Sequence, residues 1–216
     1  MLKKTMCFLM FLLLCSSAAF ALTISGSDFN NSSLVGAYNG TYVAPNMHLG
    51  YTDPTDDAVV GAKGPFGTLS NLSMSFNYSN LVGGNGNTPY AAFGLSENSL
   101  WNGSAQEFLV IAMSGNQLNG ATPIHVYDLT ADGNYLPVTW GSTLSSILGD
   151  TFNGVAFGDM NVLRAYAYIG DWHGVGNVSV DINSITVNPV PEPGTMMLLG
   201  AGFLGLAAYG KRRKKA

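Results

Sequence analysis

Charged residues and cysteines are scarce in the middle of this chain of 216 residues. Both cysteines, Cys7 and Cys15, fall in an N-terminal apolar run, and Lys63 and Arg164 are the only basic residues between the two ends. A middle region without cysteine forms no disulfide bond. Its stability therefore has to come from the burial of apolar side chains, which a domain of this size supplies.

The shortage of basic residues leaves the middle of the chain strongly acidic. Two of the nine Lys and Arg residues remain there against twelve of the thirteen Asp and Glu residues, which gives a net charge of −10. Such a charge repels nucleic acid and other acidic polymers. We therefore expect no nucleic-acid partner, whereas divalent cations would be attracted.

Motifs of the common enzyme classes are also missing. No Gly-x-Ser-x-Gly, His-Glu-x-x-His or P-loop pattern occurs. A glycosidase needs two carboxylates that face each other across a cleft, and nothing places Glu97 and Glu107 on one face. His48, His125 and His173 lack the spacing of a zinc site, so each is expected at the surface or at a strand edge. The sequence thus favours a protein that is not an enzyme.

Residues 1–21 have the features of a secretory signal peptide. Two lysines precede a short apolar run, and the segment ends in Ala19-Phe20-Ala21. The small residues Ala19 and Ala21 fit the pockets of signal peptidase, which predicts a mature start at Leu22. The apolar run is too short to span a membrane comfortably, so it is not interpreted as an anchor.

The C-terminal segment combines an extended motif, an apolar stretch and a basic cluster. Its parts are a linker over residues 188–193 that ends in Pro191, Glu192 and Pro193, an apolar stretch over residues 194–210, and a basic tail over residues 211–216 that includes Arg212 and Arg213. A helix of about 17 apolar residues lies at the short end of what spans a bilayer. Because the basic tail stays in the cytoplasm, residues 22–187 are expected on the far side of the inner membrane.

These three parts resemble the PEP-CTERM sorting signal of exosortase substrates, and the resemblance covers Val190 to Ala216. It implies recognition by an exosortase, a membrane-embedded cysteine protease-transpeptidase, and then release or transfer from the inner membrane. It also implies a Gram-negative bacterium that makes exopolysaccharide and biofilm, with the protein in the cell envelope or outside the cell. An ordinary tail-anchored protein with a proline-rich linker is the alternative reading of the same residues.

Short apolar alternations interrupted by Asn, Gly, Ser and Thr fill residues 22–187, which is a β pattern. Continuous apolar residues predict a strand covered on both sides over 108–113, and bulk on both faces predicts a central strand over 162–169. Near the C-terminal end of this region the apolar parity changes at Asn183-Ser184, where one extra residue would restore the inward set. A single short helix is expected over residues 142–148. The pattern predicts an all-β fold, an antiparallel two-sheet sandwich of the jelly-roll kind.

The segment Tyr51 to Asp57 is a candidate calcium site. Asp53, Asp56 and Asp57 supply carboxylates close together in sequence, and hard oxygen ligands of this kind suit calcium. The segment lacks the spaced glycine and the terminal glutamate of an EF-hand loop. A solvated turn without metal is the alternative interpretation.

Three tryptophans are candidates for ligand binding. Trp101, Trp140 and Trp172 each stand beside turn-forming residues, so they could form a platform on which sugar rings stack. The alternative is that each closes an end of the hydrophobic core, since large aromatic residues are usually mostly buried.

The sequence therefore predicts an exported, exosortase-processed envelope or matrix protein that binds extracellular polysaccharide or another surface molecule. A calcium-stabilised adhesive or structural module without a sugar site is the second interpretation. A secreted glycan-active enzyme is the third.

Overall fold

The computed structural model describes residues 21–53, 56–83, 89–98, 100–101, 107–129, 134–135, 142–152, 154–170 and 176–189. Residues 21–188 form one compact unit. Ala21 is exposed at its beginning. The rest of the predicted signal peptide, the Pro-Glu-Pro motif, the apolar stretch and the basic tail lie outside the described residues. Within the described ranges no helix has both the length and the apolar character needed to cross a membrane.

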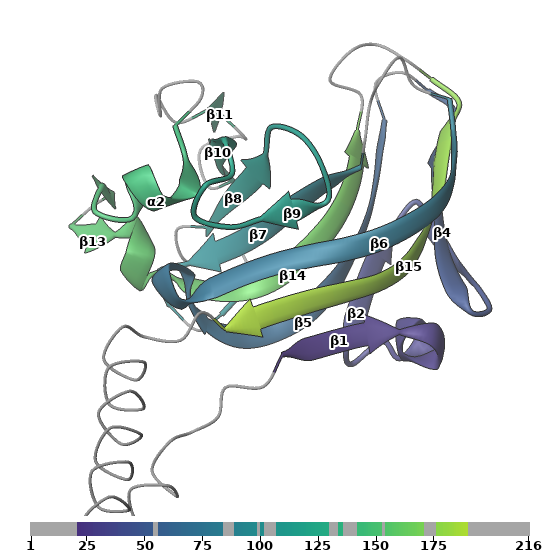
Figure 1. Ribbon diagram of the computed structural model, residues 1–216, viewed down its shortest axis with the longest axis horizontal. Helices are drawn as coiled ribbons and strands as arrows, with labels where there is room; N and C mark the ends of the chain where they lie inside the picture. The colour runs from purple at the N-terminus through teal and green to yellow at the C-terminus, as the bar shows by residue number, and fades with distance from the viewer. Residues whose placement is uncertain are drawn as a thin grey trace, which may run out of the picture. The chain divides into compact units, whose positions relative to one another are not determined.

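Two antiparallel sheets lie one over the other, with β6 and β15 in front of β14 and β5 in Figure 1. Sheet A has the order β3 (Gly40–Val43), β4 (Asn46–Tyr51), β15 (Val178–Pro189), β6 (Leu72–Val82) and β9 (Gln117–Leu118), and β1 (Leu22–Ser25) also pairs with β15. Sheet B has the order β11 (Asn134–Tyr135), β10 (Ile124–Asp128), β8 (Glu107–Ala112), β7 (Tyr90–Ser96), β14 (Asn161–Gly170), β5 (Asp57–Thr68) and β2 (Val35–Tyr38). A small hairpin joins β12 (Thr151–Phe152) to β13 (Val155–Ala156). The prediction of an antiparallel β-sandwich is confirmed.

The hydrophobic core lies between the two sheets. Leu72, Met74 and Phe76 of β6 point inward, as their alternation with polar residues predicts, and are at most 5% exposed. Phe93 of β7 and Phe108 of β8, both in sheet B, are fully buried. Burying a side chain of this size contributes roughly 1.5–3 kcal/mol, so the core provides the stability that disulfide bonds do not.

Two predictions about sheet B are confirmed. β8 is buried along most of its length, and β14 lies between β7 and β5, as a central strand should. The register of β14 shifts between Val162 and Arg164. Val162 before this irregularity and Ala165 after it both belong to the main core.

β15 contains the predicted change of parity. Val180 and Ile182 are buried before it, and Ile185 and Val187 are buried after it. The strand pairs with β4 over residues 178–182 and with β1 over residues 184–187. One extra residue between two inward sets allows a single strand of this length to serve both partners.

The helical content is small and differs from the prediction. α2 covers only Leu144–Ile147, so the expected helix over 142–148 was too long at both ends. Ser142 and Thr143, which precede α2, pair with another segment instead of joining the helix. The Ile124 amide donates to the Ser142 carbonyl, and Thr143 forms a β-bridge with Pro123. Three short 3-10 helices, η1 (Gly26–Asn30), η2 (Leu69–Asn71) and η3 (Phe157–Asp159), were not predicted.

Candidate ligand-binding face

The outward side of sheet B carries aromatic and basic side chains, and we call it the aromatic face. The strand register arranges it in three cross-strand rows. The rows are Tyr38, Val59, Tyr168 and Tyr90; then Gly36, Gly61, Tyr166, Ala92, Ile111 and His125; then Lys63, Arg164, Gly94, Leu109 and Tyr127. Residues from six strands, some of them far apart in the sequence, thus meet on one surface.

Several aromatic rings of this face lie directly over glycines. Tyr166 and Gly61 are cross-strand partners, and a Cβ atom added to Gly61 would run into the Tyr166 ring. A Cβ atom at Gly94 would lie 2.7 Å from Cη2 of Trp101. The missing side chains let the rings lie close against the sheet, as in the aromatic cover of glycines in other β-proteins. The result is a set of half-buried rings supported from below.

Trp101 and Arg164 are in direct contact. The guanidinium carbon of Arg164 lies 5.7 Å from the centre of the Trp101 ring, within the range of a cation–π interaction. Nη1 of Arg164 donates a hydrogen bond of 2.7 Å to the Leu163 carbonyl. Trp101 is half-buried on the aromatic face and does not close an end of the core. Ligand binding by Trp101 stays a prediction, and Trp140 and Trp172 lie outside the described residues.

Burial shifts the pKa values of two groups on the aromatic face, Tyr166 and His125. It raises the pKa of Tyr166 to about 12, an effect that the nearby Glu107 charge increases and that Arg164 opposes through its charge and a hydrogen bond. Burial also lowers the pKa of His125, which is 6% exposed. His125 is therefore not at the surface, one of the two positions expected for it. The other, a strand edge, is not contradicted, because the described pairing of β10 with β11 covers only Tyr127 and Asp128. Ala92 and Ile111 are buried beside His125 in a second apolar cluster, with Tyr127 and Tyr166 packed against that cluster.

The three aspartates of the candidate calcium site lie in or beside the connection between β4 and β5. Asp53 is exposed, while Asp56 and Asp57 are half-buried. Asp56 accepts hydrogen bonds from the Asp57 amide at 2.9 Å and from the Tyr38 hydroxyl at 3.4 Å. Burial raises the pKa of Asp57, the hydrogen bond from Tyr168 opposes this, and the Asp56 charge adds to it. Among the described residues no group of three or more His, Cys, Asp or Glu side chains could hold a metal ion. Calcium binding stays a prediction.

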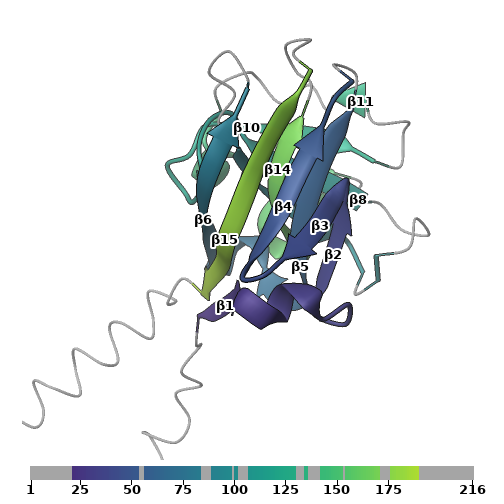
Figure 2. The ribbon, with the colours of Figure 1, turned by 90° about the vertical axis from the view of Figure 1, so that its right-hand side faces the viewer.

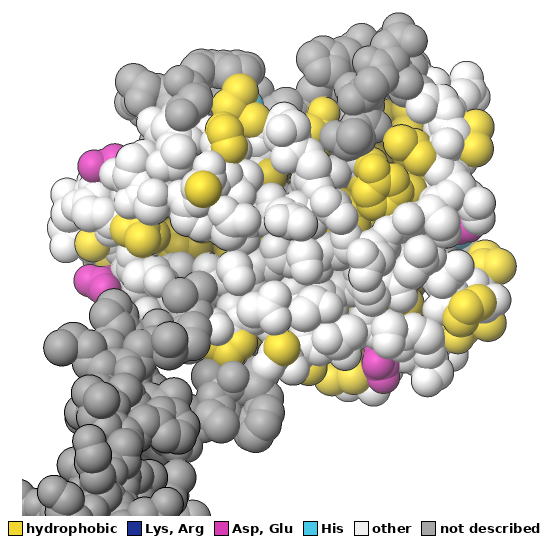
Figure 3. Space-filling model, in the orientation of Figure 1, with side chains coloured by type: hydrophobic (Ala, Val, Ile, Leu, Met, Phe, Trp, Pro, Cys, Tyr) yellow, Lys and Arg dark blue, Asp and Glu magenta, His cyan; other side chains and the backbone are white. Residues whose placement is uncertain are grey.

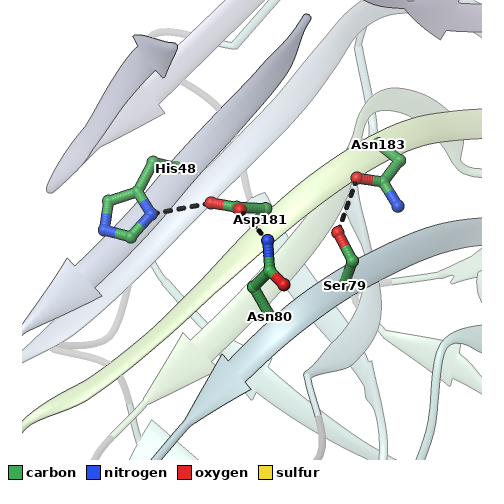
Figure 4. A network of polar contacts seen from close by, with 5 residues as sticks. All are labelled: His48, Ser79, Asn80, Asp181 and Asn183. Atoms are coloured by element: carbon green, nitrogen blue, oxygen red, sulfur yellow. Dashed lines mark hydrogen bonds and ion pairs between the residues drawn. The ribbon is translucent and has the colours of Figure 1, made fainter.

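The outward side of sheet A, which faces the viewer in Figure 2, differs from the aromatic face, and we call it the polar face. Its side chains bond one another across the strands: Asp181 accepts from His48 Nδ1 and from Asn80 Nδ2, both at 2.7 Å, and Ser79 donates to Asn183 at 3.1 Å. Figure 4 shows Asp181 between His48 and Asn80. Figure 3, with β6 and β15 in front, shows a surface of mostly uncharged polar groups. Much of the hydrogen-bonding capacity of this face is therefore used within the sheet.

A shallow polar depression lies where the loops around β9 meet. It is lined by Ser114, Asn116, Gln117, Asn119 and Thr122, among others. Most of these groups already serve the loops: Asn116 Nδ2 donates to the Phe76 carbonyl at 2.6 Å, and Thr122 Oγ1 accepts from the Asn119 amide at 3.0 Å. The depression is thus a consequence of turn structure.

Sequence reasoning found one residue of the aromatic face, Trp101, and missed most of the others. The available signal was the run Arg164, Tyr166 and Tyr168, which share one parity of a strand whose other parity is apolar. That pattern predicted a central strand, and β14 is a central strand of sheet B. Only the register with the neighbouring strands shows that the same three residues meet Lys63, Tyr90 and Gly94.

Comparison with known proteins gives information mainly about the C-terminus. No curated protein matches the chain. Among solved structures, the carbohydrate recognition domain of Emp47p aligns with 82% of this chain and 100% of its own length, at 8% identity and a TM-score of 0.38. Similarity at this level says nothing about the ligand of this chain. The family model of the PEP-CTERM protein-sorting motif matches residues 189–214. The chain therefore ends in a PEP-CTERM sorting motif, which implies an exported protein that is anchored transiently in the membrane and processed by an exosortase.

Proposed function

We propose that this protein is a non-enzymatic polysaccharide-binding module of the cell envelope or extracellular matrix, and that the aromatic face is its binding surface. The observation that carries the proposal is the stacking of Trp101 and Tyr166 over Gly94 and Gly61. Rings packed against a sheet can offer a surface on which sugar rings stack, at little cost in conformational entropy, because their positions are already fixed.

The chemistry of the two outer faces supports this choice. The aromatic face combines rings with a guanidinium group, a composition that suits stacking and hydrogen bonding to a sugar. On the polar face, Asp181 and its neighbours already use their polar atoms on one another. That the protein is not an enzyme is part of this proposal.

The proposed route to the envelope completes the function. Signal peptidase cuts after Ala21, and the segment 194–210 then holds the chain in the inner membrane with the tail 211–216 in the cytoplasm. An exosortase acts at Pro191-Glu192-Pro193 and delivers the domain to the outer surface of a Gram-negative bacterium. We also retain the jelly-roll description of the sandwich as part of this proposal.

Affinity electrophoresis in gels that contain extracellular polysaccharide from the native host tests the binding surface. Trp101→Ala and Tyr127→Ala should lose retardation by the polymer. His48→Ala is the matched control, because it removes an exposed ring from the polar face and should migrate like the wild type. Thermal melts check that each variant is folded. If Trp101→Ala lowers the melting temperature but not the retardation, Trp101 is a packing residue and the proposal is overturned.

A further inference from the structure

The two basic residues of the middle region lie next to each other on the aromatic face. Lys63 and Arg164 are the only Lys or Arg residues between residues 22 and 189. They are direct cross-strand partners on β5 and β14. Like charges in this arrangement disfavour strand pairing by themselves, so their placement calls for a compensating interaction.

The two side chains have different contacts. Lys63 Nζ donates 2.7 Å to the Ser32 carbonyl, and Arg164 lies against Trp101 and donates 2.7 Å to the Leu163 carbonyl. These hydrogen-bond acceptors are neutral. Arg164 also forms a hydrogen bond with Tyr166. Glu107 is buried on the same face and close enough for its charge to act on Tyr166.

We propose that the polysaccharide bound by the aromatic face carries carboxylate groups, as uronic-acid sugars do, and that Arg164 receives the carboxylate while Trp101 stacks on the ring. This inference rests on the proposed function. The guanidinium fork matches a carboxylate with two parallel hydrogen bonds, and contact with Trp101 fixes the plane of the fork before the ligand arrives. Lys63 adds a second positive charge in the same row.

The charge of the whole region limits how dense the carboxylates can be. With a net charge of −10, residues 22–189 repel a polyanion as it approaches. A polymer with carboxylates spaced among neutral sugars meets the local positive row without this full repulsion, since screening acts over about 10 Å at 0.1 M salt. The expected ligand is therefore a sparsely acidic polysaccharide.

Binding to one polymer in two chemical forms tests the inference. The probes are a polysaccharide that contains glucuronic acid among neutral sugars and the same polymer after chemical reduction of its carboxyl groups to alcohols. The wild-type protein should bind the acidic form about tenfold more tightly, as expected for a charge-assisted bidentate contact. Arg164→Gln and, to a lesser degree, Lys63→Gln should remove this preference and still bind the reduced polymer. Trp101→Ala should weaken binding to both.

The outcomes separate the two proposals. Equal binding of both polymers, with loss in Trp101→Ala, overturns the preference for carboxylate and leaves the aromatic face as the binding surface. Unchanged preference in a folded Arg164→Gln overturns the role of Arg164, and Arg164→Lys shows whether the fork or the charge alone is needed. Binding of both forms that Trp101→Ala leaves unchanged overturns both proposals.

Discussion

Replacing Gly61 by alanine tests directly whether the aromatic face is built as described. Gly61 is buried in β5 opposite Tyr166, and its added Cβ atom would collide with Cδ1 and Cε1 of the Tyr166 ring and lie 3.3 Å from Cγ. Tyr166 cannot keep its position over an alanine. The ring has to rotate away from the sheet or the two strands have to separate.

The expected cost follows from these contacts. Forcing an extra methyl group into a packed site costs about 1–3 kcal/mol. Alanine recovers about 0.5–1 kcal/mol, because glycine loses more backbone freedom when it is fixed in a strand. The net destabilisation of Gly61→Ala is therefore about 0–2.5 kcal/mol. Because the added atom would overlap two atoms of the Tyr166 ring, we expect a value near the upper end, which corresponds to about 5–10 °C in melting temperature for a domain of this size.

Two measurements report on the variant, and one control calibrates them. Thermal melting gives the change in stability. Spectrophotometric titration of the phenol groups follows Tyr166, whose pKa of about 12 should fall toward the ordinary value when the ring leaves its buried position. Gly149→Ala is the control, because an added Cβ atom there meets nothing within 4 Å. It should be neutral or slightly stabilising.

A double variant isolates the clash itself. In Gly61→Ala combined with Tyr166→Ala the ring is gone, so the alanine should cost nothing further and the two effects should not add. If Gly61→Ala has the melting temperature of the wild type and leaves the phenol titration unchanged, Tyr166 does not lie over Gly61. The account of supported rings would then fail.

Further predictions concern pH, calcium and processing. Hydrogen bonds from Asn80 and His48 lower the pKa of Asp181 in the folded protein. The ionised carboxylate therefore stabilises the fold at any pH above the pKa of Asp181 in the unfolded chain, and this stabilisation is lost as the pH falls through its pKa in the folded protein. Asp181→Asn should thus be less stable at pH 7 and match the wild type in acid melts. The pKa of Asp57 is raised mainly by burial, so Asp57→Asn should have the opposite effect, with a gain at pH 7 that disappears in acid. Calorimetry with calcium should give a heat signal that alanine at the three aspartates of the β4–β5 connection abolishes, and no signal at millimolar calcium would end the metal hypothesis. Pro191→Ala with Glu192→Ala should leave full-length protein in the inner membrane; peptides of the intact basic tail on most of the extracellular wild-type protein, found by mass spectrometry, would contradict processing.

The sequence by itself determined the features that depend on neighbouring residues along the chain. Alternation along β6 placed Phe76 in the core, and the change of parity in β15 was visible at Asn183-Ser184. Both follow from the two-residue period of a strand, which is local. The sorting motif is local as well, because its recognition depends on the order of a Pro-Glu-Pro sequence, an apolar stretch and basic residues.

The tertiary structure alone decided which outward residues meet. A period-two pattern shows that Arg164 and Tyr166 share one face of their own strand. Only strand order and register show that this face also carries Lys63, the cross-strand partner of Arg164. For the same reason His125 could not be recognised as buried, since its cross-strand partner Ile111 lies in another strand. The two scattered basic residues of an acidic chain became one positive row because strand pairing brings together residues that are about a hundred positions apart in the sequence.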